Sequence, residues 1–173
     1  QEPTRFNRHG SYPITATQEI EFIENIMKRE DTILCSIYDL KTKKLLGNAA
    51  LQNIDLLNRH CNIAIMIGET APFTTAVEVY GLLCNHAFMR LNLEGIHDGT
   101  HEELRKLVNM LSVIGFKEEG LLEKYFYRNN CWYSKIMFGV MRKDFLELCS
   151  QRGGNIIFDD IKDLQRAIID SIK

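Results

Sequence analysis

An apolar stretch that runs through a short turn into a helix constrains the fold of this chain most strongly. Residues 62–67 read NIAIMI, the apolar run of a buried strand, and residues 75–78 read TAVE, the pattern of a capping box. In that pattern the Thr75 hydroxyl accepts from the Glu78 amide, and the Glu78 carboxylate reaches back to the cap. A strand that continues directly into a helix predicts an α/β fold. The apolar face of this helix consists of Val79, Leu82, Leu83, Phe88 and Leu91.

The turn between this strand and this helix also bears on function. Helix N-termini attract phosphates because their first amides are unpaired and the helix dipole adds partial positive charge. Such turns are usually rich in glycine, which lets the backbone come close to the phosphates. Here Pro72 removes one amide donor, while Thr74 adds bulk together with a hydroxyl donor. The sequence therefore predicts an anion site that is weakened but retained.

The first half of the chain is predicted to begin with a short helix and a hairpin. Thr15 or Thr17 can cap a helix whose apolar face is Ile20, Ile23 and Met27. Residues 32–39 and 44–51 have strand patterns, and the polar turn 40–43 joins them.

The second half continues the alternation of strands and helices. Residues 95–99 read as a short strand, and the capping box THEE at 100–103 opens a helix that Gly115 ends in a left-handed conformation. Two aromatic strands follow at residues 118–127 and 132–140. The final amphipathic helix covers residues 159–172, with Ile161, Leu164, Ile168 and Ile172 on one side.

The composition indicates one globular domain and gives no sign of a nucleic-acid or membrane partner. The chain has 173 residues, 45% of them hydrophobic, and its net charge of -2 comes from scattered rather than clustered charges. Its five cysteines form no CxxC pair, which argues against a metal or disulfide framework and favours a reducing, cytoplasmic setting. No apolar run reaches the roughly 18 residues of a spanning helix. The sequence shows no signal peptide, although the chain begins at Gln1 rather than Met.

Several short motifs occur in an order that is more specific than any one of them. NID at 53–55 precedes the apolar strand, GFKEEG at 115–120 follows the second long helix, and YRNNCWY at 127–133 joins the last two strands. With Glu78 and Phe88 ten residues apart, they resemble the GNAT acyltransferase superfamily, in the branch of ribosomal-protein N-terminal and spermidine acetyltransferases. The resemblance covers residues 1–145 and leaves 146–173 as a C-terminal helical extension. The family's first strand has no counterpart here, so the resemblance places it upstream of Gln1.

The resemblance implies a fold, a reaction and a cofactor. The fold is a mixed, mostly antiparallel sheet flanked by helices, in which the central strand splays from the next strand beside the acyl thioester. The reaction is direct attack of a primary amine on acetyl-CoA, with no metal. The implied cofactor-binding residues are Ile65, Ile67, Thr70, Thr74, Thr75 and Ala76.

The chain departs from the family pattern at several site positions. The two loop glycines correspond to Pro72 and Thr74, and the central-strand carboxylate corresponds to Asn62. The asparagine that often contacts the cofactor corresponds to Leu104, and the tyrosine that often acts as general acid corresponds to Leu111. These departures leave open the alternative of a catalytically degenerate domain that binds a ligand or a protein.

Three residues are candidates for the proton acceptor. Glu69 lies at the end of the central strand, and His97 and His101 flank the end of the next one. Each has a plainer interpretation: a solvated charge for Glu69, a hydrogen-bonded strand residue for His97, and a helix N-terminal residue facing water for His101.

The acceptor pocket is predicted to involve Asn62, Tyr125 and Tyr127, although aromatic residues on paired strands more often pack against each other. The resemblance implies a small-molecule amine or amino sugar, or a protein N-terminus, as acceptor. The sequence leaves open whether the C-terminal helix packs on the domain or mediates a homodimer.

Overall fold

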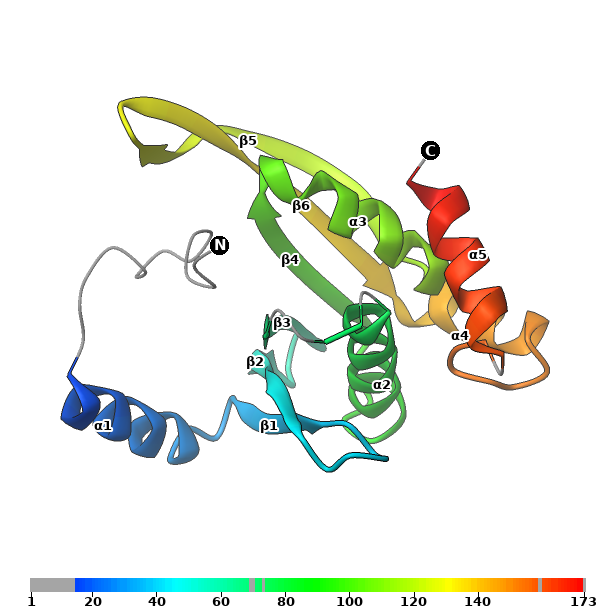
Figure 1. Cartoon of the computed structure of the whole chain (residues 1–173), viewed down its shortest axis with the longest axis horizontal. Helices are drawn as coiled ribbons and strands as arrows, with labels where there is room; N and C mark the ends of the chain where they lie inside the picture. Colours follow the sequence, from blue (N-terminus) through cyan, green and yellow to red (C-terminus); the bar gives the residue numbers. More distant parts are fainter. Residues whose placement is uncertain (1–14, 69–70, 73, 159, 173) are drawn as a thin grey trace.

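Six strands form one mixed sheet in the order β1-β2-β3-β4-β6-β5 (Figure 1). The structure is a computed structural model, and it describes residues 15–68, 71–72, 74–158 and 160–172. The strands are β1 (Ile33–Tyr38), β2 (Leu45–Asp55), β3 (His60–Ile67), β4 (Gly95–His101), β5 (Lys117–Arg128) and β6 (Cys131–Met141).

The sheet consists of two antiparallel halves that meet at one short parallel pair. Strands β1, β2 and β3 form one half, and β4, β6 and β5 form the other. Between the halves, β3 and β4 pair through His60↔Gly95 and Cys61↔Ile96. Figure 1 shows β4 and the long β5–β6 hairpin running away from β3 beyond this point. The mixed, mostly antiparallel sheet expected from the sequence is confirmed.

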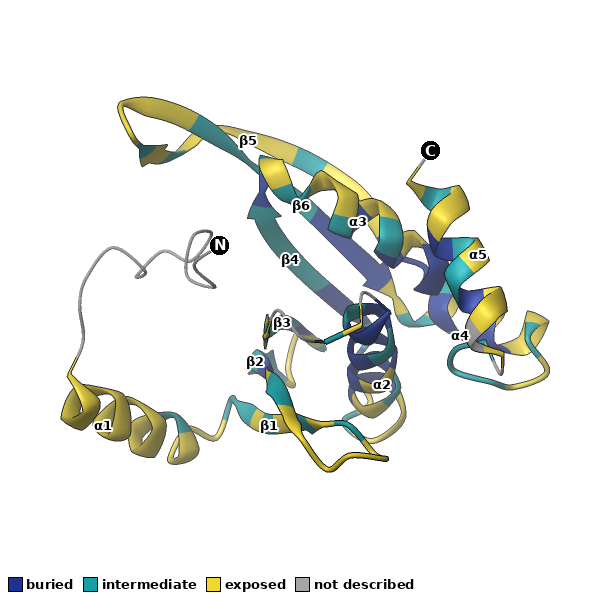
Figure 2. Ribbon diagram, in the orientation of Figure 1, coloured by how far each residue is buried: buried dark blue, intermediate teal, exposed yellow. Residues whose placement is uncertain are grey.

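Four helices accompany the sheet on one side and bury the core. They are α2 (Thr75–Met89), α3 (Arg105–Leu111), α4 (Arg142–Gln151) and α5 (Ile161–Ser171), and short 3-10 turns at Glu102–Leu104 and Ser112–Ile114 flank α3. Figure 2 shows the buried residues concentrated on α2 and on the sheet strands beside it. No helix in the described part of the chain is long and apolar enough to cross a membrane. The largest fully buried side chains include Phe88, Phe116, Phe138, Phe145, Leu164 and Ile168.

Helix α1 (Ala16–Met27) begins as predicted but buries none of its residues. Thr15 is its N-cap, and the hydroxyl of Thr15 accepts from the amide of Gln18 while the Gln18 side chain accepts from the Thr15 amide. Its expected apolar face is exposed, with Met27 at 74%. Figure 2 shows α1 extending away from the helices that cover the sheet. Local capping therefore defines the start of this helix, although none of its residues is buried.

The two other predicted capping boxes are wrong. Helix α2 has Thr74 rather than Thr75 at its N-cap, and the Glu78 amide donates to the Thr74 carbonyl rather than to a hydroxyl. At the second site, β4 continues through Thr100 to His101, and the His101 ring caps the turn instead. The cap of α2 lies one residue before the predicted one, and at the second site the pairing of β4 with β6 as far as His101 moves the cap one residue later.

Past Gly115 the chain follows the prediction in part. Gly115 has a φ of 97° and ends the helical segment, as expected. Helix α4 was missed, and its Phe145 and Cys149 enter the core. The predicted final helix is present as α5, in which Leu164 and Ile168 are buried.

Candidate functional site

The gap between β3 and β4 is the feature that distinguishes this sheet. The two strands pair at Cys61↔Ile96 and then separate, although β3 continues to Ile67 and β4 to His101. Beyond Cys61↔Ile96, backbone groups on the facing edges of β3 and β4 therefore form no further ladder pairs with each other. A bound molecule with its own donors and acceptors can take that place.

The amides of alternate β3 residues point into this gap. The Gly68 amide donates to the Leu46 carbonyl of β2, which makes Ile67 and Gly47 a non-hydrogen-bonded pair. Backbone groups of Ile67 therefore face away from β2. Because strands repeat every two residues, the amides of Ile65 and Ile63 face the same side. Ile65 and Ile67, two of the predicted cofactor-binding residues, thus present donors to the gap.

Asn62 closes the narrow end of the gap. Its side-chain amide donates to the His97 carbonyl of β4, and its Oδ1 accepts from the Asn53 amide group at 3.0 Å. The Asn62 side chain is thus occupied in tying β2, β3 and β4 together where the ladder ends. Asn62, which was predicted to bind substrate, therefore holds the three strands together at the edge of the gap.

Asp98 is the residue at this site that the sequence reasoning missed. It lies on β4 two residues beyond the last ladder pair, and its Oδ1 accepts from the Gly99 amide at 2.7 Å. Burial raises the pKa of its carboxyl group to about 7, against the opposing effects of the Gly99 and Ile63 amides and of the Lys135 charge. The sequence signal was slight: a single carboxylate inside a predicted strand, at a position that alternates with His97.

His97 lies on the opposite face of β4 and pairs with Glu119 of β5. Its Nδ1 is 3.0 Å from each carboxylate oxygen of Glu119, and its ring meets His60 edge-on at 6.2 Å. The His97 ring lies back along the strand over Gly95: a Cβ atom added at Gly95 would lie 2.7 Å from the His97 Nε2. About 42% of the His97 side chain is exposed.

His101 is buried rather than facing water. Only 3% of it is exposed, and its ring packs against Phe126 and Tyr133 at centroid distances of 5.1 and 4.7 Å. Its Nδ1 accepts from the Glu103 amide at 3.3 Å. These contacts give His101 a capping and packing part at the end of β4, away from the narrow end of the gap.

The predicted acceptor-pocket tyrosines lie on the projecting hairpin. Tyr125 is 47% exposed and carries the Lys135 ammonium over its ring at 5.0 Å. Tyr127 is 57% exposed and packs against Trp132 across the hairpin, with ring centroids 4.9 Å apart. Tyr127 is therefore engaged in cross-strand packing, as the plainer interpretation expected.

The N-terminus of α2 follows directly from β3, but its threonines turn inward. Thr74 is 2% exposed and Thr75 is 7% exposed. The Thr75 amide already donates to the Pro72 carbonyl at 3.0 Å. Ala76 and Val77 occupy the first turn, where backbone amides have no acceptor within the helix. The predicted residues Glu69 and Thr70 lie outside the described part of the chain.

The positions of two family site residues are occupied by apolar side chains. Leu111 is fully buried in the core, so no acid can act from its position in this arrangement. Leu104 is only partly buried and ends the 3-10 turn before α3. Among the described residues, no group of three or more His, Cys, Asp and Glu is placed to hold a metal ion.

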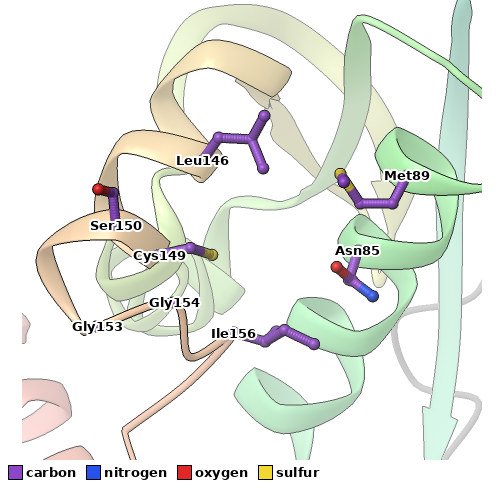
Figure 3. Close-up of a pocket in the computed structure, with 8 residues that line it drawn as sticks. All are labelled: Asn85, Met89, Leu146, Cys149, Ser150, Gly153, Gly154 and Ile156. Atoms are coloured by element: carbon purple, nitrogen blue, oxygen red, sulfur yellow. The ribbon is translucent and has the colours of Figure 1, made fainter.

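A pocket with a volume of about 430 Å³ lies between α2 and α4 (Figure 3). Figure 3 shows Asn85 and Met89 of α2 facing Leu146 and Cys149 of α4 across it. Burial raises the pKa of the Cys149 thiol, which leaves the thiol protonated and a poor nucleophile. The pocket therefore offers shape but little reactive chemistry. The remaining lining residues are Ser150, Gly153, Gly154 and Ile156.

Comparison with solved structures identifies the fold. The spermidine N-acetyltransferase of Vibrio cholerae in complex with CoA and spermine shares 22% identity with this chain, at a TM-score of 0.69, over 78% of this chain and 80% of that one. A chimera of that enzyme with hSSAT shares 21% identity, at a TM-score of 0.70, over 80% of this chain and 85% of the other. No protein-family model matches the sequence, and no curated protein matches it. The chain thus has the fold of these acetyltransferases, which confirms the GNAT-like fold expected from its motifs.

Proposed function

We propose that this protein is an N-acetyltransferase that moves an acetyl group from acetyl-CoA to a primary amine by direct attack. The observation that carries the proposal is the gap between β3 and β4, lined by the amides of Ile65 and Ile67. Donors held in place by a strand stabilise an oxyanion that develops on a thioester carbonyl. The order of strand, turn and helix then puts the start of α2 beside the same gap.

In this proposal the CoA pyrophosphate lies at the first turn of α2. The Ala76 amide supplies a donor there, because Thr74, Thr75 and Val77 are buried. A backbone donor of the helix, rather than a threonine side chain, then replaces the phosphate contacts that a glycine-rich turn would make. Positioning of the two reactants supplies much of the rate in such a reaction.

The acceptor in this proposal is a small cationic amine, such as a polyamine or an amino sugar. A structural neighbour was solved with CoA and spermine, which supports an acceptor of the polyamine kind. Exposed carboxylates of β5, such as Glu123, would attract a cation toward the sheet. We propose further that residues 1–145 form the transferase domain and 146–173 its helical extension.

A negative charge added at the helix start tests the cofactor site. In Ala76→Glu the new carboxylate interacts favourably with the helix dipole but repels the pyrophosphate, so acetyl-CoA affinity should fall at least about tenfold with no loss of thermal stability. Leu82→Glu is the matched control, since Leu82 lies on the same helix and is 58% exposed. Calorimetric titration of acetyl-CoA measures both variants against the parent protein.

Turnover of acetyl-CoA with polyamines, amino sugars and peptides then tests the reaction itself. An inactive parent protein that fails to bind acetyl-CoA at millimolar concentration would refute the proposal and favour a repurposed scaffold. Equal acetyl-CoA affinities of Ala76→Glu and Leu82→Glu would show that the pyrophosphate does not bind at the start of α2.

A further inference from the structure

We infer that Asp98 is the general base of this reaction, an inference that rests on the proposed function. In this assignment the Asp98 carboxylate takes the proton of the incoming ammonium, directly or through one water, between β3 and β4. Asp98 supplies a carboxylate on β4 beyond the point where the β3–β4 ladder ends, whereas Asn62 of β3 carries an amide.

The position of Asp98 follows from the register of the strands. It lies beyond the last ladder pair, Cys61↔Ile96, and its carboxylate accepts from the Gly99 amide at 2.7 Å. The Ile63 amide of β3 lies near enough to lower the pKa of this carboxyl group. The Ile63 amide is the first β3 donor past the ladder, and the Ile65 amide follows about 7 Å further along the same side. A thioester carbonyl held at Ile65 therefore leaves an attacking amine within reach of Asp98, or one water from it.

The surroundings of Asp98 suit a group that exchanges protons near neutral pH. Burial raises its pKa to about 7, while the Gly99 and Ile63 amides and the Lys135 charge of β6 act in the opposite direction. The other groups that face it stay protonated: burial raises the pKa of Tyr80 on α2 well above its usual value and that of Cys61 on β3 to about 12. A base is most effective when its pKa lies near the working pH.

Asp98, the amine, the thioester and water account for every proton and electron pair in this reaction. An alkylammonium with a pKa near that of lysine, about 10.4, loses one proton to Asp98 and becomes a free amine. The amine nitrogen forms a bond to the thioester carbonyl carbon, and the carbon–sulfur bond then breaks with its electron pair on sulfur. The second proton of the nitrogen passes to the CoA thiolate. Asp98 releases its proton to water before the next cycle.

His97 is less well placed for the same task. It lies on the opposite face of β4, where Glu119 holds its Nδ1 at 3.0 Å. Its Nε2 is folded back over Gly95, toward the paired end of the strands rather than toward the open gap.

Asp98→Asn separates proton transfer from structure. The asparagine keeps an oxygen for the Gly99 and Ile63 amides but accepts no proton. We expect kcat to fall about 100-fold or more, with the calorimetric affinity for acetyl-CoA within about threefold of the parent protein. The kcat/KM of the parent protein should rise with pH through an apparent pKa near 7, and the variant should lose that inflection. Asp163→Asn, an exposed carboxylate on α5, is the control and should retain both rate and inflection.

The outcomes separate this inference from the proposed function. If the parent protein transfers acetyl groups but Asp98→Asn keeps its rate within threefold or keeps the inflection, Asp98 is not the base. Loss of the inflection in His97→Gln would likewise overturn the assignment. A carbon-13 titration of the Asp98 carboxyl group needs no turnover, and a midpoint below about 5 would also overturn it. A parent protein that binds acetyl-CoA without transferring acetyl to any amine would refute the reaction, and with it the assignment.

Discussion

Replacing Asp98 by asparagine is expected to change how the stability of the folded protein depends on pH. The Asp98 carboxyl group has an ordinary pKa of 3.8 and a pKa of about 7 in the fold, because burial disfavours its charged form. Between these values the folded chain holds a proton that the unfolded chain has lost. Unfolding then releases a proton, so the free energy of unfolding falls as the pH rises.

The size of the effect follows from the two pKa values. Each unit of difference corresponds to about 1.36 kcal/mol, so the whole contribution is about 4 kcal/mol. It is fully present below pH 3.8 and is lost as the pH rises through about 7. About 2.5 kcal/mol of this loss falls between pH 5 and pH 8.

Urea unfolding at pH 5, 6, 7 and 8 measures the effect directly. Asparagine keeps the size and the amide acceptor of Asp98 but does not titrate. The free energy of unfolding of Asp98→Asn, relative to that of the parent protein, should therefore rise by about 2.5 kcal/mol from pH 5 to pH 8. All other groups titrate equally in both proteins, so the difference isolates Asp98. Asp163→Asn, on the exposed side of α5, should run parallel to the parent protein.

A constant difference between Asp98→Asn and the parent protein over this pH range would refute the reasoning. It would mean that the Asp98 carboxylate is ionised throughout, stabilised by the Gly99 and Ile63 amides and by Lys135 more than burial opposes it.

Two further predictions concern the frame around the gap. Gly115→Ala should destabilise the protein by about 1–2 kcal/mol in urea unfolding, because Gly115 has a φ of 97° and a new Cβ would lie 3.2 Å from Val140; unchanged stability would show that the helix end adjusts freely. Leu164→Ala should cost about 2–5 kcal/mol because Leu164 is buried in the core, whereas Ile169→Ala on the exposed side of α5 should cost less than about 0.5 kcal/mol. Equal thermal stabilities of these two variants would mean that α5 does not pack on the domain.

The sequence predicted the strand positions of the acceptor-pocket tyrosines but not the residues around them. Tyr125 and Tyr127 were placed correctly on the last hairpin, because alternating aromatic residues identify a strand by a local pattern. Whether they line a pocket depends on partners from other strands, and the pairing of Tyr127 with Trp132 shows one such partner. Their part in binding an acceptor stays a prediction.

Local patterns in the sequence determined the elements of this protein. The apolar run at residues 62–67 gave a strand, Thr15 gave a cap, and Gly115 gave a helix end, since each depends on neighbours a few residues away. The order of the short motifs carried the resemblance that implied a mixed, mostly antiparallel sheet. Helix α4 was not predicted, and it begins one residue after β6 ends.

The tertiary structure alone decided which side chains have chemistry available to them. Burial of His101 comes from Phe126 and Tyr133, which are more than twenty residues away along the chain. Asp98 gains its raised pKa from burial in the fold, although the Gly99 and Ile63 amides and the Lys135 charge act in the opposite direction. Burial and electrostatic fields sum over all neighbours in space, whereas a sequence pattern records only neighbours along the chain. The strands could therefore be predicted from the sequence, but the raised pKa of Asp98 on β4 could not.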